Sequence, residues 1–191
     1  MVAQPQLHMM TPDPDDFDRF ALLPENHDRL FEFIAGEIVE VVSNPLSSNI
    51  GAILNAFINI FVLQHNLGHV TGADGGYKIG RERYIPDVGF ISYQRQRVLM
   101  HVDGYNPLAP DLAVEVLSPG NVDVDMDVKI ANYLAAGTVV WRVKPLEQQI
   151  AVFVPDKPVT VLGINDVLDG GNVLPGFALP LRDIFRTPPA D

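Results

Sequence analysis

A single carboxylate inside an apolar run constrains this chain more than any other feature. Residues 110–117 read PDLAVEVL, in which Leu112, Val114 and Val116 alternate with their neighbours as in a β-strand. Glu115 stands inside that run. A buried carboxylate is costly unless it is paired or bound to a cation. The sequence therefore predicts a strand whose one acid has either an ion-pair partner or a metal.

A second acid and a lysine flank this strand in the sequence. Residues 84–92 (YIPDVGFIS) predict another strand, with Asp87 inside it. The helix expected over 123–136 carries Lys129. The alternative interpretation of this lysine is a surface ion pair with Asp125, four residues earlier, worth about 0.3–0.5 kcal/mol.

Two carboxylates and a lysine of this kind suit metal-dependent hydrolysis. Hard oxygen ligands bind Mg²⁺ or Mn²⁺ and leave several waters on the metal. The metal lowers the pKa of a bound water and stabilises charge on a phosphoryl oxygen, and a lysine beside it orients or deprotonates the attacking water. Residue types alone leave another interpretation open, in which Asp87 belongs to a turn and Glu115 pairs with a buried arginine.

The N-terminal half predicts a hairpin and then a long helix. Residues 30–43 indicate the hairpin, with Gly36 at its turn. Glu32 and Glu37 lie on its strands, where a solvent-facing charge is the simplest interpretation of both. Residues 45–65 predict the longest helix, because apolar residues recur there at three- and four-residue steps. The expected core stripe is Ile50, Ile53, Leu54, Phe57, Ile60 and Phe61.

The C-terminal part predicts further strands and an apolar tail. Strands are expected over 138–143 and 149–154, with an edge strand over 159–162. The tail at 174–181 (LPGFALPL) is expected to pack along the surface.

Composition indicates one folded domain. The chain has 191 residues, 47% of them apolar and 19% charged, which is enough to bury a core. We expect a flexible start at residues 1–10, a single domain at 11–186 and a short tail at 187–191. The absence of cysteine excludes disulfides and thiolate metal sites.

No membrane or secretion signal is apparent. The apolar stretch at 50–63 contains two asparagines and is too short to span a bilayer. The N-terminus lacks a cationic segment followed by an apolar one. We therefore expect a cytoplasmic protein without a membrane partner.

The net charge of −11 opposes nonspecific binding to a phosphate backbone. Its distribution is uneven, because acids are concentrated in residues 13–28, whereas basic residues lie on either side of Asp87. These are Lys78, Arg81, Arg83, Arg95 and Arg97. Two interpretations of this basic cluster stay open: a solvated loop surface, or a phosphate-contacting rim beside the acidic site.

The ordered set of motifs resembles one protein family over residues 9–186. The most specific pieces are PDV at 86–88, PDLAVEVLSP at 110–119 and the Lys-x-x-x-Tyr-x-x-x-Gly run at 129–137. Together they resemble the Uma2 family of predicted endonucleases, the domain of unknown function numbered 820. This family is assigned the PD-(D/E)XK restriction-endonuclease-like fold. The resemblance implies an α/β (α+β) fold with a central mixed β-sheet flanked by helices.

The resemblance also implies roles for individual residues. Asp87 matches the aspartate of the PD motif and Glu115 the second acid, so both are expected to bind the metal. Lys129 matches the catalytic lysine, which this family carries on the next helix. The PD-(D/E)XK motif as written places its lysine two residues after the second acid, and in this chain that position is Leu117. Glu32 matches a further acid of the family pattern and is expected to support the site.

The resulting expectation is a Mg²⁺- or Mn²⁺-dependent endonuclease that hydrolyses DNA. The alternative is a noncatalytic module that keeps the nuclease fold and binds a protein or nucleic-acid partner, which the acidic net charge favours. RNA hydrolysis uses the same chemistry and stays open. A homodimer is compatible with cutting both strands of a duplex. Many relatives carry a histidine before the long helix and read Trp-Leu-Val-Asp-Pro where this chain has Trp141-Arg-Val-Lys-Pro145. These departures concern activity more than fold.

Overall fold

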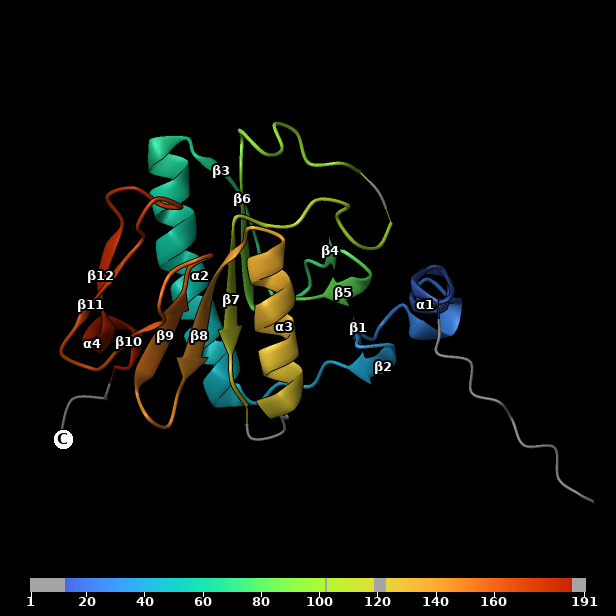
Figure 1. Cartoon of the computed structure of the whole chain (residues 1–191), viewed down its shortest axis with the longest axis horizontal. Helices are drawn as coiled ribbons and strands as arrows, with labels where there is room; N and C mark the ends of the chain where they lie inside the picture. The colour runs from blue at the N-terminus through green and yellow to red at the C-terminus, as the bar shows by residue number, and fades with distance from the viewer. Residues whose placement is uncertain (1–12, 102, 119–122, 187–191) are drawn as a thin grey trace, which may run out of the picture.

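A six-stranded mixed sheet forms the centre of the protein, with helices on both faces (Figure 1). The computed structural model describes residues 13–101, 103–118 and 123–186. The helices are α1 (Pro14–Ala21), α2 (Pro45–His65), α3 (Asp123–Ala135) and α4 (Leu181–Ile184), with a 3₁₀ turn at Pro24–Asn26. The strands are β1 (Phe31–Ile34), β2 (Glu37–Glu40), β3 (Gly68–Thr71), β4 (Tyr77–Ile79), β5 (Glu82–Tyr84), β6 (Val88–Ser92), β7 (Leu112–Val116), β8 (Val139–Lys144), β9 (Gln149–Phe153), β10 (Thr160–Leu162), β11 (Val167–Asp169) and β12 (Ala178–Pro180). The expected flexible start at 1–10 and the tail at 187–191 lie outside the described residues.

The large sheet has the strand order β10-β9-β8-β7-β6-β3. β7 and β8 are parallel and joined by α3, whereas the other neighbours pair antiparallel. A parallel pair needs a crossover connection, which places the connecting helix over one face of the sheet. The central mixed sheet flanked by helices, expected from the resemblance, is thereby confirmed.

The two faces of the large sheet are covered by different helices. Along β7, Leu112, Val114 and Val116 belong to the core under α2, whereas Ala113 belongs to the core under α3. The alternation follows from the two-residue period of a strand. The α2 side is the larger core and contains Trp141, which is 1% exposed.

Helix α2 has the bounds that the sequence predicted. Its N-cap is Asn44, whose side chain accepts hydrogen bonds from the backbone N–H groups of Leu46 and Ser47. Asn66, with φ of 53°, is the C-cap that ends the helix. The inner face consists of Ile50, Leu54, Ile58 and Val62, all buried. Ile60, which the sequence placed in the core stripe, is 55% exposed.

By length and composition alone, α2 is also apolar enough to cross a membrane, because the helix extends beyond the apolar stretch at 50–63. The core helix of a globular domain passes the same test, and the inner face of α2 packs against the large sheet. The packing therefore identifies α2 as a core helix with an unusually apolar outer face.

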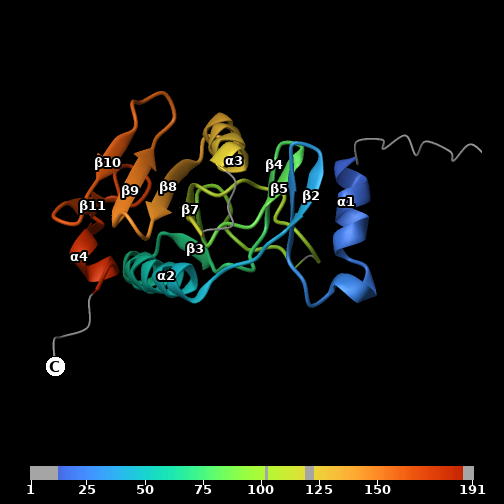
Figure 2. The ribbon, with the colours of Figure 1, turned by 90° about the horizontal axis from the view of Figure 1, so that it is seen from below.

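A second, smaller sheet lies between α1 and the rest of the protein (Figure 2). Its order is β2-β1-β5-β4, and every pairing is antiparallel. The expected hairpin at 30–43 is β1–β2, which turns through Ala35 and Gly36, both with positive φ. This combination is typical of a type I′ turn. Phe17 of α1 packs against Phe33, which closes one face of the sheet.

The C-terminal tail is not a surface strap, contrary to the sequence-based expectation. Residues 167–184 form the β11–β12 hairpin and α4. Their apolar side chains enter the larger core, where Phe177 stacks on Trp141. This hairpin was not recognised from the sequence, because prolines interrupt the segment and each of its strands is only three residues long.

Candidate active site

The register of β6 and β7 brings Asp87 and Glu115 to the same end of the large sheet. The two strands pair antiparallel with Val88 opposite Val114. One further step along this register places Asp87 opposite Glu115. The sequence predicted Asp87 inside a strand, but β5 ends at Tyr84 and β6 begins at Val88, so Asp87 lies in the three-residue connection between them.

Two of the acids also hold backbone groups. Asp87 Oδ2 accepts a hydrogen bond from the N–H of Val116 at 2.7 Å. Glu32 Oε1 accepts one from the N–H of Ile85, also at 2.7 Å. Glu32 is buried, so the interpretation of its side chain as a solvent-facing charge was wrong, whereas Glu37 is exposed as expected. The connection from β5 to β6 is thus fixed at both ends by carboxylates.

Lys129 joins the small sheet to the large one. Its Nζ lies 2.8 Å from Glu32 Oε1 and 2.9 Å from the Glu115 carboxylate. All three residues are at most 6% exposed. The surface pair with Asp125 is therefore not the role of Lys129, because its partners lie on β1 and β7.

Aromatic residues complete the surroundings of this cluster. The hydroxyl of Tyr133 donates a hydrogen bond to Glu115 Oε1 at 3.0 Å. Lys129 Nζ lies 5.4 Å from the centre of the Tyr84 ring, a cation–π contact, and Asn132 donates to the Tyr84 hydroxyl. Sequence reasoning assigned no role to Tyr133. The four-residue spacing between Lys129 and Tyr133 could have indicated this role, because that spacing puts both side chains on one face of α3.

The cluster lines a cleft with a cavity volume of about 640 Å³. The cleft lies between the hairpin β1–β2, the start of α2, the end of β7 and the first turns of α3. Its acidic and basic lining residues are Glu32, Glu40, Asp87, Glu115, Asp125 and Lys129. Ser47 of α2 donates a hydrogen bond to the carbonyl of Leu117 at 2.8 Å, which ties the helix start to the end of β7.

The cluster carries more negative charge than positive charge. Glu32, Asp87 and Glu115 face the single ammonium of Lys129, so two negative charges are left over when all four groups are ionised. Burial raises the pKa of Glu115 to about 8, and the charges of Glu32 and Asp87 add to this effect while Lys129 opposes it. Burial also raises the pKa of Asp87.

Lys129 keeps its charge in this environment. Burial alone would lower the pKa of Lys129, but Glu115 and Glu32 outweigh burial and raise it. One ammonium cannot neutralise two buried carboxylates. The attraction of Lys129 therefore does not offset burial, and the pKa of Glu115 stays raised.

The donor set fits a divalent cation held by few protein ligands. Among the described residues, no three histidine or acidic side chains are close enough together to hold a metal ion. Asp87 and Glu115 are two hard carboxylates in one cleft, and Mg²⁺ is usually held by one or two carboxylates with several waters. A divalent cation would also match the excess of two negative charges.

Most of the basic residues that flank Asp87 in the sequence form ion pairs with acids that do not line the cleft. Arg83 donates from Nε to Asp18 Oδ1 at 2.7 Å and from Nη2 to Asp18 Oδ2 at 3.0 Å. Lys78 Nζ lies 2.7 Å from Asp18 Oδ2, and Arg95 Nε lies 3.0 Å from Asp111. These contacts favour a structural role for Lys78, Arg83 and Arg95 over a phosphate-contacting one, whereas Arg81 and Arg97 of the same cluster are exposed.

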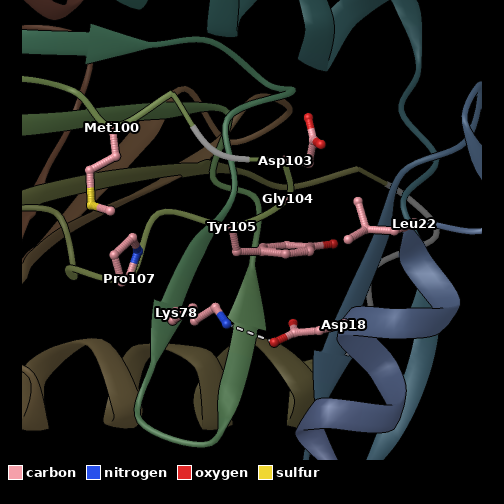
Figure 3. Close-up of a pocket in the computed structure, with 8 residues that line it drawn as sticks. All are labelled: Asp18, Leu22, Lys78, Met100, Asp103, Gly104, Tyr105 and Pro107. Atoms are coloured by element: carbon pink, nitrogen blue, oxygen red, sulfur yellow. Dashed lines mark hydrogen bonds and ion pairs between the residues drawn. The ribbon is translucent and has the colours of Figure 1, made fainter.

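The Asp18–Lys78 pair forms part of the wall of a second cavity, of about 290 Å³ (Figure 3). This cavity is lined by Asp18, Leu22, Lys78, Met100, Asp103, Gly104, Tyr105 and Pro107. It shares no lining residue with the acidic cleft. The ring of Tyr105 crosses it, and the Tyr105 hydroxyl donates to the carbonyl of Phe31. Lys78 and Asp18 therefore hold α1 against the small sheet.

We expect Asp18→Ala to lower the free energy of unfolding by about 2–3 kcal/mol. The substitution leaves the buried guanidinium of Arg83 without its bidentate partner and frees Lys78. Urea unfolding measures the loss. Asp16→Ala on the same helix is the matched control, since Asp16 pairs only with the exposed Arg19. Equal, small effects of both substitutions would contradict a structural role for Asp18.

Comparisons with known proteins find a matching family and a solved structure with the same fold. Residues 14–182 match the model of the Uma2 family, which is described as "Putative restriction endonuclease". The crystal structure of a protein from Anabaena variabilis, described as a "putative nuclease belonging to DUF820", superposes with a TM-score of 0.80. It shares 22% sequence identity, over 91% of this chain and 97% of the other. No curated protein matches the chain.

Proposed function

The chain belongs to the Uma2 family, and from this membership and the geometry of the cleft we propose that it is a metal-dependent endonuclease that hydrolyses phosphodiester bonds of DNA. The observation that carries the proposal is the convergence of Asp87, Glu115 and Lys129 in one cleft, where acids outnumber the single ammonium. A purely structural cluster of this kind would be costly, because buried charges without partners destabilise a fold.

Asp87 and Glu115 are the residues that would hold Mg²⁺ or Mn²⁺. When bound, such an ion lowers the pKa of a water and stabilises negative charge on a phosphoryl oxygen. Asp87 uses Oδ2 to hold the N–H of Val116, so the backbone fixes the orientation of this carboxylate. Tyr133 orients Glu115 in the same way through its hydroxyl. Both acids are thus oriented before a ligand arrives.

Lys129 supplies the positive charge of the site. Its ammonium is held by Glu32 and Glu115 and stays protonated. In that state it stabilises charge that develops on a phosphoryl oxygen and orients a water by donating a hydrogen bond. Glu32 acts as a positioning residue, because it fixes both Lys129 and the N–H of Ile85.

The proposal is tested by cleavage of supercoiled plasmid and of labelled duplex, single-stranded DNA and RNA, with Mg²⁺ or Mn²⁺. We expect Asp87→Asn and Glu115→Gln each to lower the cleavage rate by roughly 100-fold or more, since each removes a negative donor while keeping shape. Glu37→Gln, at an exposed acid on β2, is the matched control and should retain full activity. Unchanged cleavage in Asp87→Asn would overturn the site.

A noncatalytic binding module is the second candidate, favoured by one specific observation. The net charge is −11, and the basic residues Lys78, Arg83 and Arg95 are neutralised by acids of the same chain. Calorimetric titration of Mn²⁺ into the protein separates the candidates together with the cleavage assay. Cation binding that Glu115→Gln abolishes supports the enzyme. Absence of both cation binding and cleavage supports the binding module.

A further inference from the structure

The acidic cleft contains very little positive charge that could hold a phosphate backbone. All 13 Lys and Arg residues of the chain lie in the described parts of the structure, and among them Lys129 alone lines the cleft. Its ammonium is shared by Glu32 and Glu115. Arg29 lies beside the cleft, where its Nη2 is 2.6 Å from the lining acid Glu40. Such a cleft cannot neutralise a row of phosphates, on which duplex binding largely depends.

The same cleft has an apolar wall that metal-dependent hydrolysis does not use. The wall consists of four side chains at the base of the hairpin β1–β2, namely Leu30, Val39, Val41 and Val42. The N–H of Val41 donates to the carbonyl of Leu30 at 2.9 Å, which sets these two residues side by side. Val42 is 77% and Leu30 38% exposed, whereas Val39 and Val41 are half-buried. Apolar side chains in a cleft beside a few charged groups are typical of a ligand site.

We propose that the cleft takes an unpaired nucleotide of a DNA strand, with the base on the apolar wall and the phosphate at the end where Asp87, Glu115 and Lys129 lie. The inference rests on the proposed nuclease function, since it requires that the cleft receive nucleic acid. In a duplex the bases are stacked and paired, so a protein meets phosphates and groove edges. An unpaired strand exposes the faces of its bases, which apolar side chains contact.

The size of the cleft agrees with this substrate. Its volume of about 640 Å³ lies in the range of roughly 300–1,000 Å³ that is usual for small-ligand sites. Specific complexes with duplex DNA instead bury roughly 1,000–2,500 Å² of a strongly basic protein surface. The net charge of −11 opposes a surface of that kind. The cleft is therefore matched in size and charge to a nucleotide and not to a duplex.

Fluorescence anisotropy tests the preference directly. The probes are a labelled DNA strand of about 15 nucleotides and the blunt duplex of the same sequence. Ca²⁺ replaces Mg²⁺ and neutralises the acids, and a gel run afterwards verifies that the strands are intact. We expect the single strand to bind at least about tenfold more tightly than the duplex. Duplex binding as tight as that of the single strand, or no binding of either, would overturn the inference.

The salt dependence of binding gives a second readout. The logarithm of the association constant for the single strand should fall with the logarithm of KCl concentration with a slope between about −0.7 and −1.4. Each contacted phosphate contributes about −0.7, and the cleft and its edge offer only Lys129 and Arg29 among the described cations. A slope steeper than about −3 would indicate a row of phosphate contacts and would contradict binding through the base.

A gain of affinity tests the apolar wall itself. Val42→Trp adds an aromatic face to the wall and should tighten binding of the single strand at least about fivefold, because bases stack on aromatic side chains. Binding of the duplex should not change. Val98→Trp is the matched control, since Val98 is 73% exposed in the connection between β6 and β7 and does not line the cleft. No gain in Val42→Trp, or an equal gain in both variants, would refute the wall as the base site.

The inference and the proposed function fail in different ways. Cleavage of plasmid and duplex with Mg²⁺, without preferential binding of the single strand, would overturn the inference and leave the nuclease function standing. Preferential binding that Val42→Trp strengthens, without cleavage of any substrate, would support the nucleotide site and overturn the nuclease function.

Discussion

Lys129→Met should lower the free energy of unfolding at pH 8 by about 3–5 kcal/mol. The substitution keeps the length of the side chain but leaves Glu32 and Glu115 buried without their shared cation. Removing one member of a buried ion pair is costly for this reason. The loss should shrink toward pH 5, where the raised pKa of Glu115 lets this acid take up a proton.

Urea unfolding followed by tryptophan fluorescence measures this loss well. Trp141 is the only tryptophan and is buried in the larger core. Lys157→Met, at an exposed position between β9 and β10, is the control and should change stability by no more than about 0.5 kcal/mol. A loss below about 1 kcal/mol in Lys129→Met would mean that the three-residue cluster contributes little to folding.

The stability of the wild type should fall as the pH rises from about 5 to about 8. The pKa of Glu115 is raised from its ordinary value of 4.5 to about 8 in the folded protein, so the folded state binds a proton that the unfolded chain has released. The stabilisation from this extra proton is complete below the pKa that Glu115 has in the unfolded chain. It is lost as the pH rises through the pKa that Glu115 has in the folded protein. Asp87, whose pKa is also raised, acts in the same direction. The steepest slope is roughly 1 kcal/mol per pH unit for one proton.

Two further stability measurements test whether Glu115 is the source of this pH dependence. Glu115→Gln resembles the protonated acid and should flatten the curve, with stability at pH 8 equal to or above that of the wild type. Saturating Mg²⁺ should also flatten the curve of the wild type if the cation occupies the carboxylates, because it replaces the proton. An unchanged slope in Glu115→Gln would assign the dependence to another group.

Local patterns predicted the elements of this fold well. The bounds of α2 follow from a polar N-cap, a proline at the first helical position and a continuous apolar period. The strand β7 follows from the alternation of Leu112, Val114 and Val116, and β8 lies within a few residues of the strand expected over 138–143. The resemblance supplied what these patterns do not contain, a central mixed sheet flanked by helices, whereas the order of its strands was not predicted. The C-terminal hairpin was missed because three-residue strands carry too little periodicity.

The site was predicted as a set of residues but not as a set of contacts. Glu32 was interpreted as solvent-facing because alternation describes a strand with one buried face, whereas all four residues of β1 are buried. Lys129 has a local candidate partner, Asp125, yet its partners lie 14 and 97 residues away in sequence. Arg83 finds Asp18, 65 residues upstream. Such pairings depend on how the two sheets meet, which no local pattern specifies.

The connection between β5 and β6 has a mechanical consequence. Ile85, Pro86 and Asp87 are the direct link from the small sheet to the large one, and carboxylates fasten this link to β1 at one end and to β7 at the other. The link therefore fixes how the two sheets meet, and the same acids that line the cleft hold it in place.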